Sequence, residues 1–79
     1  MELKKQIESL IEAGRNALQR GFDERAFLMW RQRAIDCLAV LFGKDHHYTH
    51  YFKTRIVRAE AIDILAGVGV LTAARMAVP

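Results

Sequence analysis

The chain has 79 residues, of which 52% are hydrophobic and 27% charged, and this composition excludes an intrinsically disordered protein. It contains one cysteine, Cys37, so an intrachain disulfide is excluded, and a lone thiol is typical of the reducing cytosol. Lys and Arg number 12 against 9 acidic residues, and the resulting charge of +3 is spread along the chain, which does not favour a nucleic-acid-binding protein.

An amphipathic helix is predicted from Glu2 to Arg20. Apolar residues recur at spacings of three and four along one side of it: Leu3, Ile7, Leu10, Ile11, Gly14, Ala17 and Leu18. Because Lys4 and Lys5 precede this pattern in place of an apolar run, we expect no secretory signal and a cytoplasmic protein. Gly14 costs about 1 kcal/mol relative to Ala inside a helix, which indicates close packing against a neighbouring helix at that position.

A tight turn is predicted at residues 20–23. Gly21 suits the left-handed position just after a helix, and Asp23 suits the N-cap of the next one. Phe22 and Phe27 have the spacing of a hydrophobic staple around that cap. We therefore expect two antiparallel helices joined by this turn.

The second predicted helix extends from Glu24 to Phe42, and Gly43 is its expected end. Its main apolar face consists of Ala26, Phe27, Trp30, Ala34, Cys37, Leu38 and Leu41. Leu28, Ile35 and Phe42 form a second apolar stripe at heptad spacing beside that face. One neighbouring helix cannot cover both, so a third helix or a second subunit is required.

Trp30 and Cys37 are expected in the core, because both lie on the main apolar face of the second helix. A buried apolar thiol is inert as a nucleophile. The alternative for Trp30 is that it lines a pocket for a small apolar ligand. The stretch around Gly67 and Gly69 lacks the third glycine of a phosphate-binding loop, and Ser9 has no catalytic partner in view. We therefore predict no cofactor and no enzymatic activity.

Three histidines follow the second helix, and Asp45 is expected to cap a short helix that begins at His46. On a helix, His50 lies one turn after His46 and His47, a spacing that suits zinc. The H-E-x-x-H pattern is absent because His47 occupies the glutamate position, and Cys37 is assigned to the core, so we predict no metal site. The aromatic residues of this segment are expected to turn inward: Tyr48, Tyr51 and Phe52.

One long helix is predicted from Arg55 to Met76, because this stretch has no proline and consists mostly of good helix formers. Gly67 and Gly69 near its middle indicate a kink or a close helix crossing.

The end of this helix is expected to form a protein interface. After Asp63 its only charged residue is Arg75, so it has almost no polar face, and it is too short and interrupted to span a bilayer. A domain this small cannot enclose it, which predicts a homo-oligomer, a symmetric dimer or a higher assembly, and leaves a further protein partner open. The expected interface residues are Leu28, Ile35, Phe42, Ile64, Leu65, Val68, Leu71 and Met76.

Nucleic-acid binding is the alternative function considered from the charges. The residues that would form a basic face are Arg31, Arg33, Arg55 and Arg58, near Tyr48 and Tyr51. Cations with aromatics are typical of single-strand binding. Asp36, Glu60 and Asp63 dilute this charge, so solvated helix faces are the favoured interpretation.

Two stretches carry a resemblance to a known group of proteins. The quoted residues are Trp30, Ala34, Leu38, the run 41–45, Tyr48, Tyr51, Phe52 and the run 67–74. They resemble the N-terminal helical module of uncharacterised bacterial proteins, some of them linked to phage abortive infection. More chain usually follows in those proteins, whereas this chain ends at Pro79, which fits a free-standing copy from a mobile gene. The resemblance implies an interaction module and names no active site.

Residues 1–79 are therefore expected to form one all-α domain, a three- or four-helix antiparallel bundle that self-associates. The predicted function is a non-enzymatic protein–protein interaction module. Binding of nucleic acid or of a small apolar ligand near Trp30 remains as the two alternatives.

Overall fold

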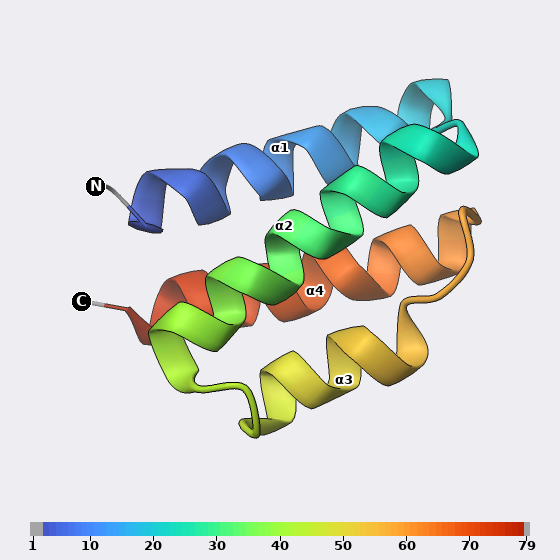
Figure 1. The fold of residues 1–79 in the computed structure, drawn as a ribbon. Helices are drawn as coiled ribbons and strands as arrows, with labels where there is room; N and C mark the ends of the chain where they lie inside the picture. Colours follow the sequence, from blue (N-terminus) through green and yellow to red (C-terminus); the bar gives the residue numbers. More distant parts are fainter. Residues whose placement is uncertain (1–2, 79) are drawn as a thin grey trace.

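The computed structural model describes residues 3–78, which form four helices and no strand (Figure 1). The helices are α1 (Leu3–Arg20), α2 (Glu24–Phe42), α3 (His47–Arg55) and α4 (Ala61–Ala77). Consecutive helices run in opposite directions, and α1 packs along α4 (Figure 1). The prediction of an all-α antiparallel bundle is confirmed, with four helices. The predicted first residue of the first helix, Glu2, lies outside the described residues.

The turn between α1 and α2 forms as predicted. Gly21 has a φ of +88°, the left-handed conformation that a side chain disfavours, and its N–H donates to the carbonyl of Ala17. Asp23 caps α2, since its Oδ1 accepts from the Ala26 N–H at 2.7 Å. From this turn α1 and α2 diverge, as Figure 1 shows.

The start of α3 differs from the prediction. His46, and not Asp45, is the N-cap: its Nδ1 accepts from the Tyr48 N–H at 3.1 Å. Its backbone is extended, with φ −67° and ψ 147°, which is the conformation that points a side chain back at the free N–H groups of a helix start. Thr49, fully buried, donates from Oγ1 to the Gly43 carbonyl at 2.9 Å and ties α3 to the end of α2.

The long helix predicted from Arg55 to Met76 is wrong, because the chain leaves the helix between α3 and α4. The carboxylate of Asp63 accepts from the N–H groups of Val57 and Arg58, at 3.1 and 2.8 Å. These backbone groups would otherwise need helical partners. Residues 56–60 contain no glycine or proline, so the local sequence does not predict this break in the helix.

Arg31 of α2 also binds the segment between α3 and α4. Its Nε donates to the Ile56 carbonyl at 2.6 Å and its Nη2 donates to the Lys53 carbonyl at 2.7 Å. Both acceptors lie at the end of α3, where carbonyls lack helical partners. Ile56 itself is completely buried. The guanidinium of Arg31 on α2 therefore binds the carbonyl groups at the end of α3, next to the buried side chain of Ile56.

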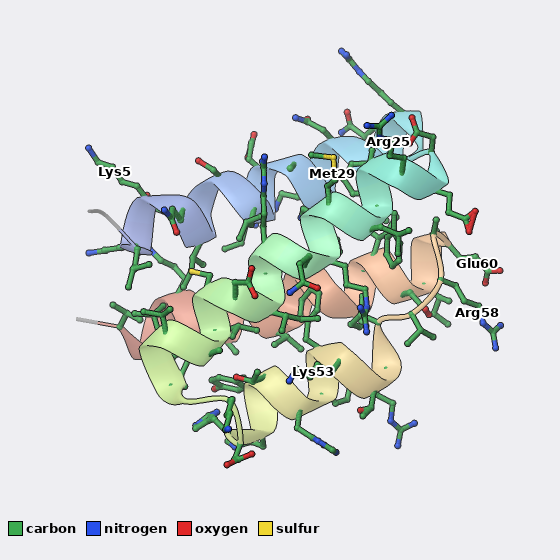
Figure 2. The ribbon with its side chains drawn as sticks, in the orientation of Figure 1. Lys5, Arg25, Met29, Lys53, Arg58 and Glu60 are labelled. Carbon is green, nitrogen blue, oxygen red and sulfur yellow. The ribbon has the colours of Figure 1, made fainter. Side chains whose placement is uncertain are left out.

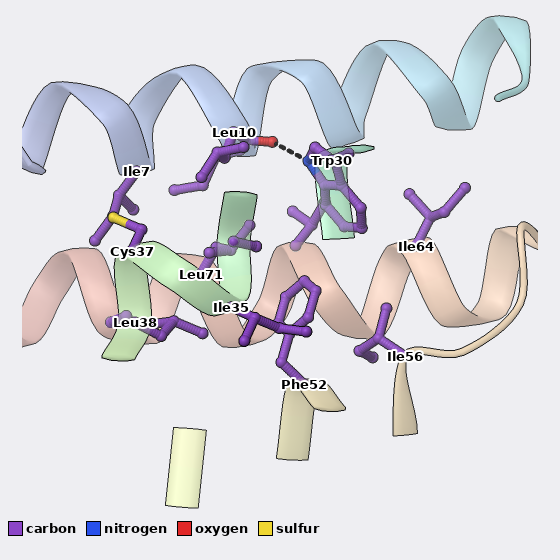
Figure 3. Close-up of a cluster of buried hydrophobic side chains, with 14 of the residues drawn as sticks. Ile7, Leu10, Trp30, Ile35, Cys37, Leu38, Phe52, Ile56, Ile64 and Leu71 are labelled. Atoms are coloured by element: carbon purple, nitrogen blue, oxygen red, sulfur yellow. Dashed lines mark hydrogen bonds between the residues drawn. The ribbon is translucent and has the colours of Figure 1, made fainter. Parts of the chain in front are cut away.

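Trp30 occupies the centre of the core, as predicted (Figure 3). Its indole N–H donates to the Leu10 carbonyl of α1 at 2.8 Å. A Cβ on Gly14 would lie 3.1 Å from Trp30 Cζ2, and one on Gly67 would lie 2.7 Å from Trp30 Cη2. The two glycines thus let α1 and α4 close on the two sides of the indole. The close approach predicted at Gly14 is confirmed, and α4 continues without interruption through Gly67.

Aromatic rings surround Trp30 on its remaining sides. The centroids of Phe52, Phe22 and Phe27 lie 5.5, 5.7 and 6.2 Å from the indole. Phe52 is completely buried, as predicted, whereas Tyr51 is 42% exposed, so the inward orientation predicted for that side chain is wrong. The nine residues of α3 present only one side to α2 and α4, and Tyr51 lies on the other side.

Candidate interaction surface

The solvent-facing side of α4 carries no charged and no hydrogen-bonding side chain. We call it the outer face of α4, and it consists of Ala61, Ile62, Leu65, Gly69, Ala73, Met76 and Ala77. Its large members are strongly exposed: Ile62 at 73%, Leu65 at 60% and Met76 at 81%. A surface helix ordinarily places its polar residues on this side. The outer face of α4 is therefore an apolar surface that the chain itself does not cover.

Each polar side chain of α4 is engaged within the chain. Asp63 binds the loop before the helix. Thr72 donates from Oγ1 to the Val68 carbonyl at 2.7 Å. Arg75 donates from Nε to Glu8 Oε2 of α1, also at 2.7 Å. The polar groups of the helix are thus directed along its flanks, and the outer face between them remains apolar.

The charged side of α1 borders this face. A shallow depression between α1 and α4 is lined by Glu8, Ile11, Glu12, Arg15, Thr72, Arg75 and Met76. Glu8, Glu12 and Arg15 follow one another at helical spacing, so they form a charged row along one edge of the outer face. An apolar strip with a charged rim is the arrangement found at protein interfaces.

The expected interface residues divide into two groups. Four are buried in the core of the chain's own bundle and are not accessible to a second copy: Ile35, Ile64, Val68 and Leu71. The prediction for these four is corrected, since the core of one chain already covers them. Leu28, Leu65 and Met76 are exposed, and Phe42 is half-buried. Ile62 was missed, although it precedes Leu65 by one helical turn.

The second apolar stripe of α2 is covered only in part, and α3 is the third helix that packs against its Phe42 end. Phe42 lies with its ring centroid 4.9 Å from His46 and 5.3 Å from Tyr48. Ile35 is only 5% exposed, while Leu28 remains 52% exposed. Only the first residue of this stripe is therefore available for a partner.

The four arginines considered for nucleic acid do not form one face. Arg31 is bound to the end of α3, whereas Arg33 lines a groove between α1 and α2 beside Lys5 and Asp36. Basic side chains are scattered over the surface: Figure 2 shows Lys5 and Arg58 at opposite ends of the molecule. Arg33 is therefore separate from the other three, because Arg55 and Arg58 lie within two residues of Ile56, whose carbonyl accepts from Arg31.

The groove between α1 and α2 is open and has a volume of about 720 Å³. It is lined by Leu3, Lys5, Gln6, Ser9, Leu10, Arg33, Asp36, Cys37 and Val40. Trp30 lines neither this groove nor the depression beside α4, and only 4% of the residue is exposed. The ligand pocket considered at Trp30 is therefore filled by the protein's own side chains. Burial raises the pKa of the Cys37 thiol, so this residue is a poor nucleophile.

His46 and His47 lie at the start of α3. The Nδ1 of His46 accepts from a backbone N–H, and its ring stacks on His47 with centroids 4.3 Å apart. Within residues 3–78 no group of three or more His, Cys, Asp or Glu side chains is placed to hold a metal ion. In the same part of the chain, no helix combines the length and the apolar character needed to cross a membrane.

No protein-family model, no curated protein and no solved structure matches this chain. A function can therefore be inferred only from the surfaces described above.

Proposed function

We propose that the protein is a non-enzymatic helical module that self-associates through the outer face of α4. One observation carries this proposal: seven exposed positions on a 17-residue helix are all apolar. Such a helix is about 25 Å long, which is enough to form the centre of an interface. Exposed apolar patches with polar rims mark sites of protein interaction.

The size of the chain supports the same proposal. A stable interface buries about 800 Å² on each partner, and the accessible surface of this chain is 5190 Å². Helices α1 and α4 run along the long dimension of the molecule, so a surface that follows α4 extends over much of its length (Figure 1). Small domains commonly gain stability by association, because their own core is limited.

Further points favour an interaction module in the cytoplasm. The single thiol is buried and has a raised pKa, so it is not activated for catalysis. A lone reduced cysteine fits a reducing compartment. The resemblance to the N-terminal helical module of abortive-infection-associated proteins also implies interaction without chemistry.

Light scattering with a charge variant tests the proposal. The wild-type protein should have at least twice the mass of the 9.0 kDa chain at about micromolar concentration. Leu65→Glu should remain folded, because residue 65 is 60% exposed. The same variant should dissociate at least about a hundredfold more readily, since each of two buried carboxylates costs more than the ~1.4 kcal/mol of a tenfold change.

Val40→Glu is the matched control. Val40 is 68% exposed and lies on α2 beside the groove with α1, away from α4. It should leave the mass of the wild-type assembly unchanged. A wild-type chain that stays monomeric at high concentration would contradict the proposal, as would an equal loss of association in both variants.

A further inference from the structure

The exposed positions of the outer face of α4 are arranged symmetrically about Gly69, whereas the sizes of their side chains are not. Ile62 and Met76 lie seven residues before and after it, and Leu65 and Ala73 lie four residues before and after it. At 3.6 residues per turn these positions all point within about 40° of the direction of Gly69. The face therefore has large residues at its two ends and at Leu65, and small residues at Gly69 and Ala73.

This pattern is complementary to itself only when the helices are antiparallel. Reversal about Gly69 places Leu65 against Ala73 of the second copy, a large residue beside a small one. It also places Ile62 against Met76 of the second copy, and the central glycines allow close approach of the two helices. A parallel pair would stack Leu65 on Leu65 and leave a gap at Gly69 and Ala73, which close packing disfavours.

Two contacts between α1 and α4 show which residues of the two helices lie at the same level along the bundle. Glu8 is paired with Arg75, and a Cβ on Gly14 would collide with Val68. Because the two helices are antiparallel, a step to the next residue of α1 corresponds to a step to the preceding residue of α4. By this register, Glu12 is level with residues 70–71 of α4.

The same register places Arg15 level with residues 67–68 of α4. Glu12 and Arg15 thus lie on opposite sides of the level of Gly69, at nearly equal distances from it. A twofold axis beside Gly69 places Glu12 opposite Arg15 of the second copy, and it does so twice by symmetry. A parallel twofold arrangement would instead place the two charged rows on opposite sides of the interface, where Glu12 and Arg15 of the two copies could not pair. The charges and the sizes therefore favour the same orientation.

We infer that the partner of this surface is a second copy of the chain, bound antiparallel through α4 with a twofold axis beside Gly69 and Glu12 opposite Arg15 of the second copy. This inference rests on the proposed function and adds the orientation and the register. It describes a bundle at the interface that consists of α1 and α4 from each copy.

Cysteine cross-linking tests the register in the full chain. The background is Cys37→Ser, which removes the native thiol. Leu65→Cys and Ala73→Cys place thiols at exposed positions, so the monomer fold is retained. Disulfides require Cα atoms about 4.4–6.8 Å apart. On mild oxidation, a mixture of the two variants should give a mixed disulfide dimer, whereas each variant alone should give little. Gly69→Cys alone should cross-link to itself.

A charge exchange gives an independent measurement. Glu12→Arg and Arg15→Glu should each weaken the dimer about tenfold, because two attractive pairs become repulsive. The double variant with both changes should recover wild-type affinity. Val40→Cys and Val40→Glu are the controls for the two experiments, since this position lies away from α4.

The outcomes separate the inference from the proposal on which it rests. A monomeric wild-type protein would overturn both. A dimer that Leu65→Glu dissociates, but in which Leu65→Cys and Ala73→Cys each cross-link to themselves, would overturn the antiparallel orientation alone. The same holds if none of the three cysteine variants cross-links while Leu65→Glu still dissociates the dimer. A mixed disulfide together with recovery in the double charge variant is the expected result.

Discussion

Replacing Gly67 by alanine should destabilise the protein, although alanine is the better helix former. The added methyl group would lie 2.7 Å from Trp30 Cη2 and 3.1 Å from Phe52 Cζ. Neither ring can easily move, since Phe52 is completely buried and the Trp30 indole donates its N–H to α1. Overpacking of this kind costs about 3 kcal/mol at the upper end of its usual range. The gain in helix propensity is about 1 kcal/mol, so a net loss of about 2 kcal/mol is expected.

Gly69→Ala is the matched control for this prediction. It lies on the same helix, and a Cβ there meets no atom within 4 Å. The same propensity should therefore stabilise the monomer by about 1 kcal/mol. The two variants should differ by about 3 kcal/mol, which corresponds to about 15 °C in melting temperature for a domain of this size.

Urea unfolding followed by circular dichroism measures this difference. It is best done at the lowest practical concentration, because residue 69 lies at the proposed dimer axis. Equal stabilities of the Gly67 and Gly69 variants would refute the packing of Trp30 between α1 and α4. A stabilised Gly67→Ala variant would refute it as well, since no room exists there for a methyl group.

Three further outcomes are expected. Arg31→Ala should lower the free energy of unfolding by about 1–3 kcal/mol, because two carbonyls at the end of α3 lose a charged donor; Arg25→Ala, at an exposed position, should change it little in the same denaturation assay. His46→Ala should cost about 1 kcal/mol through loss of the cap, whereas His46→Asn should retain most of it; equal thermal melts of the two variants would contradict this role. Cys37 should react with a thiol reagent much more slowly in the native protein than in urea, because burial raises its pKa; equal rates would show that the thiol is accessible.

Self-association would explain how a chain with so small a core tolerates an apolar helix at its surface. Ile62 and Met76 are more exposed than any other large hydrophobic side chains in residues 3–78. Both lie on the outer face of α4, near its two ends. In water such a face is an aggregation liability unless a partner covers it. The cross-linking and scattering experiments therefore also determine which form of the protein is stable in solution.

Local chemistry alone determined much of the fold. Gly21, Asp23 and Gly43 mark the ends of α1 and α2, because a left-handed backbone and an N-cap depend on the residue that occupies the position. The spacing of apolar residues on α1 and α2 likewise identified their core faces, since polar residues occupy the opposite sides. These features are read within one or two turns of chain, so no distant contact was needed to predict them.

Only the tertiary structure decided the rest. The break between α3 and α4 depends on Arg31, which lies more than 20 residues earlier, and on Asp63 reaching back to the loop. On α4 nearly every position is apolar, so periodicity could not distinguish Val68, which meets α1 at Gly14, from Leu65, which faces outward. That choice follows from where Trp30 needs space, and the face left over is the candidate interface. Distant side chains select among backbone and rotational states that the local sequence leaves nearly equal in free energy.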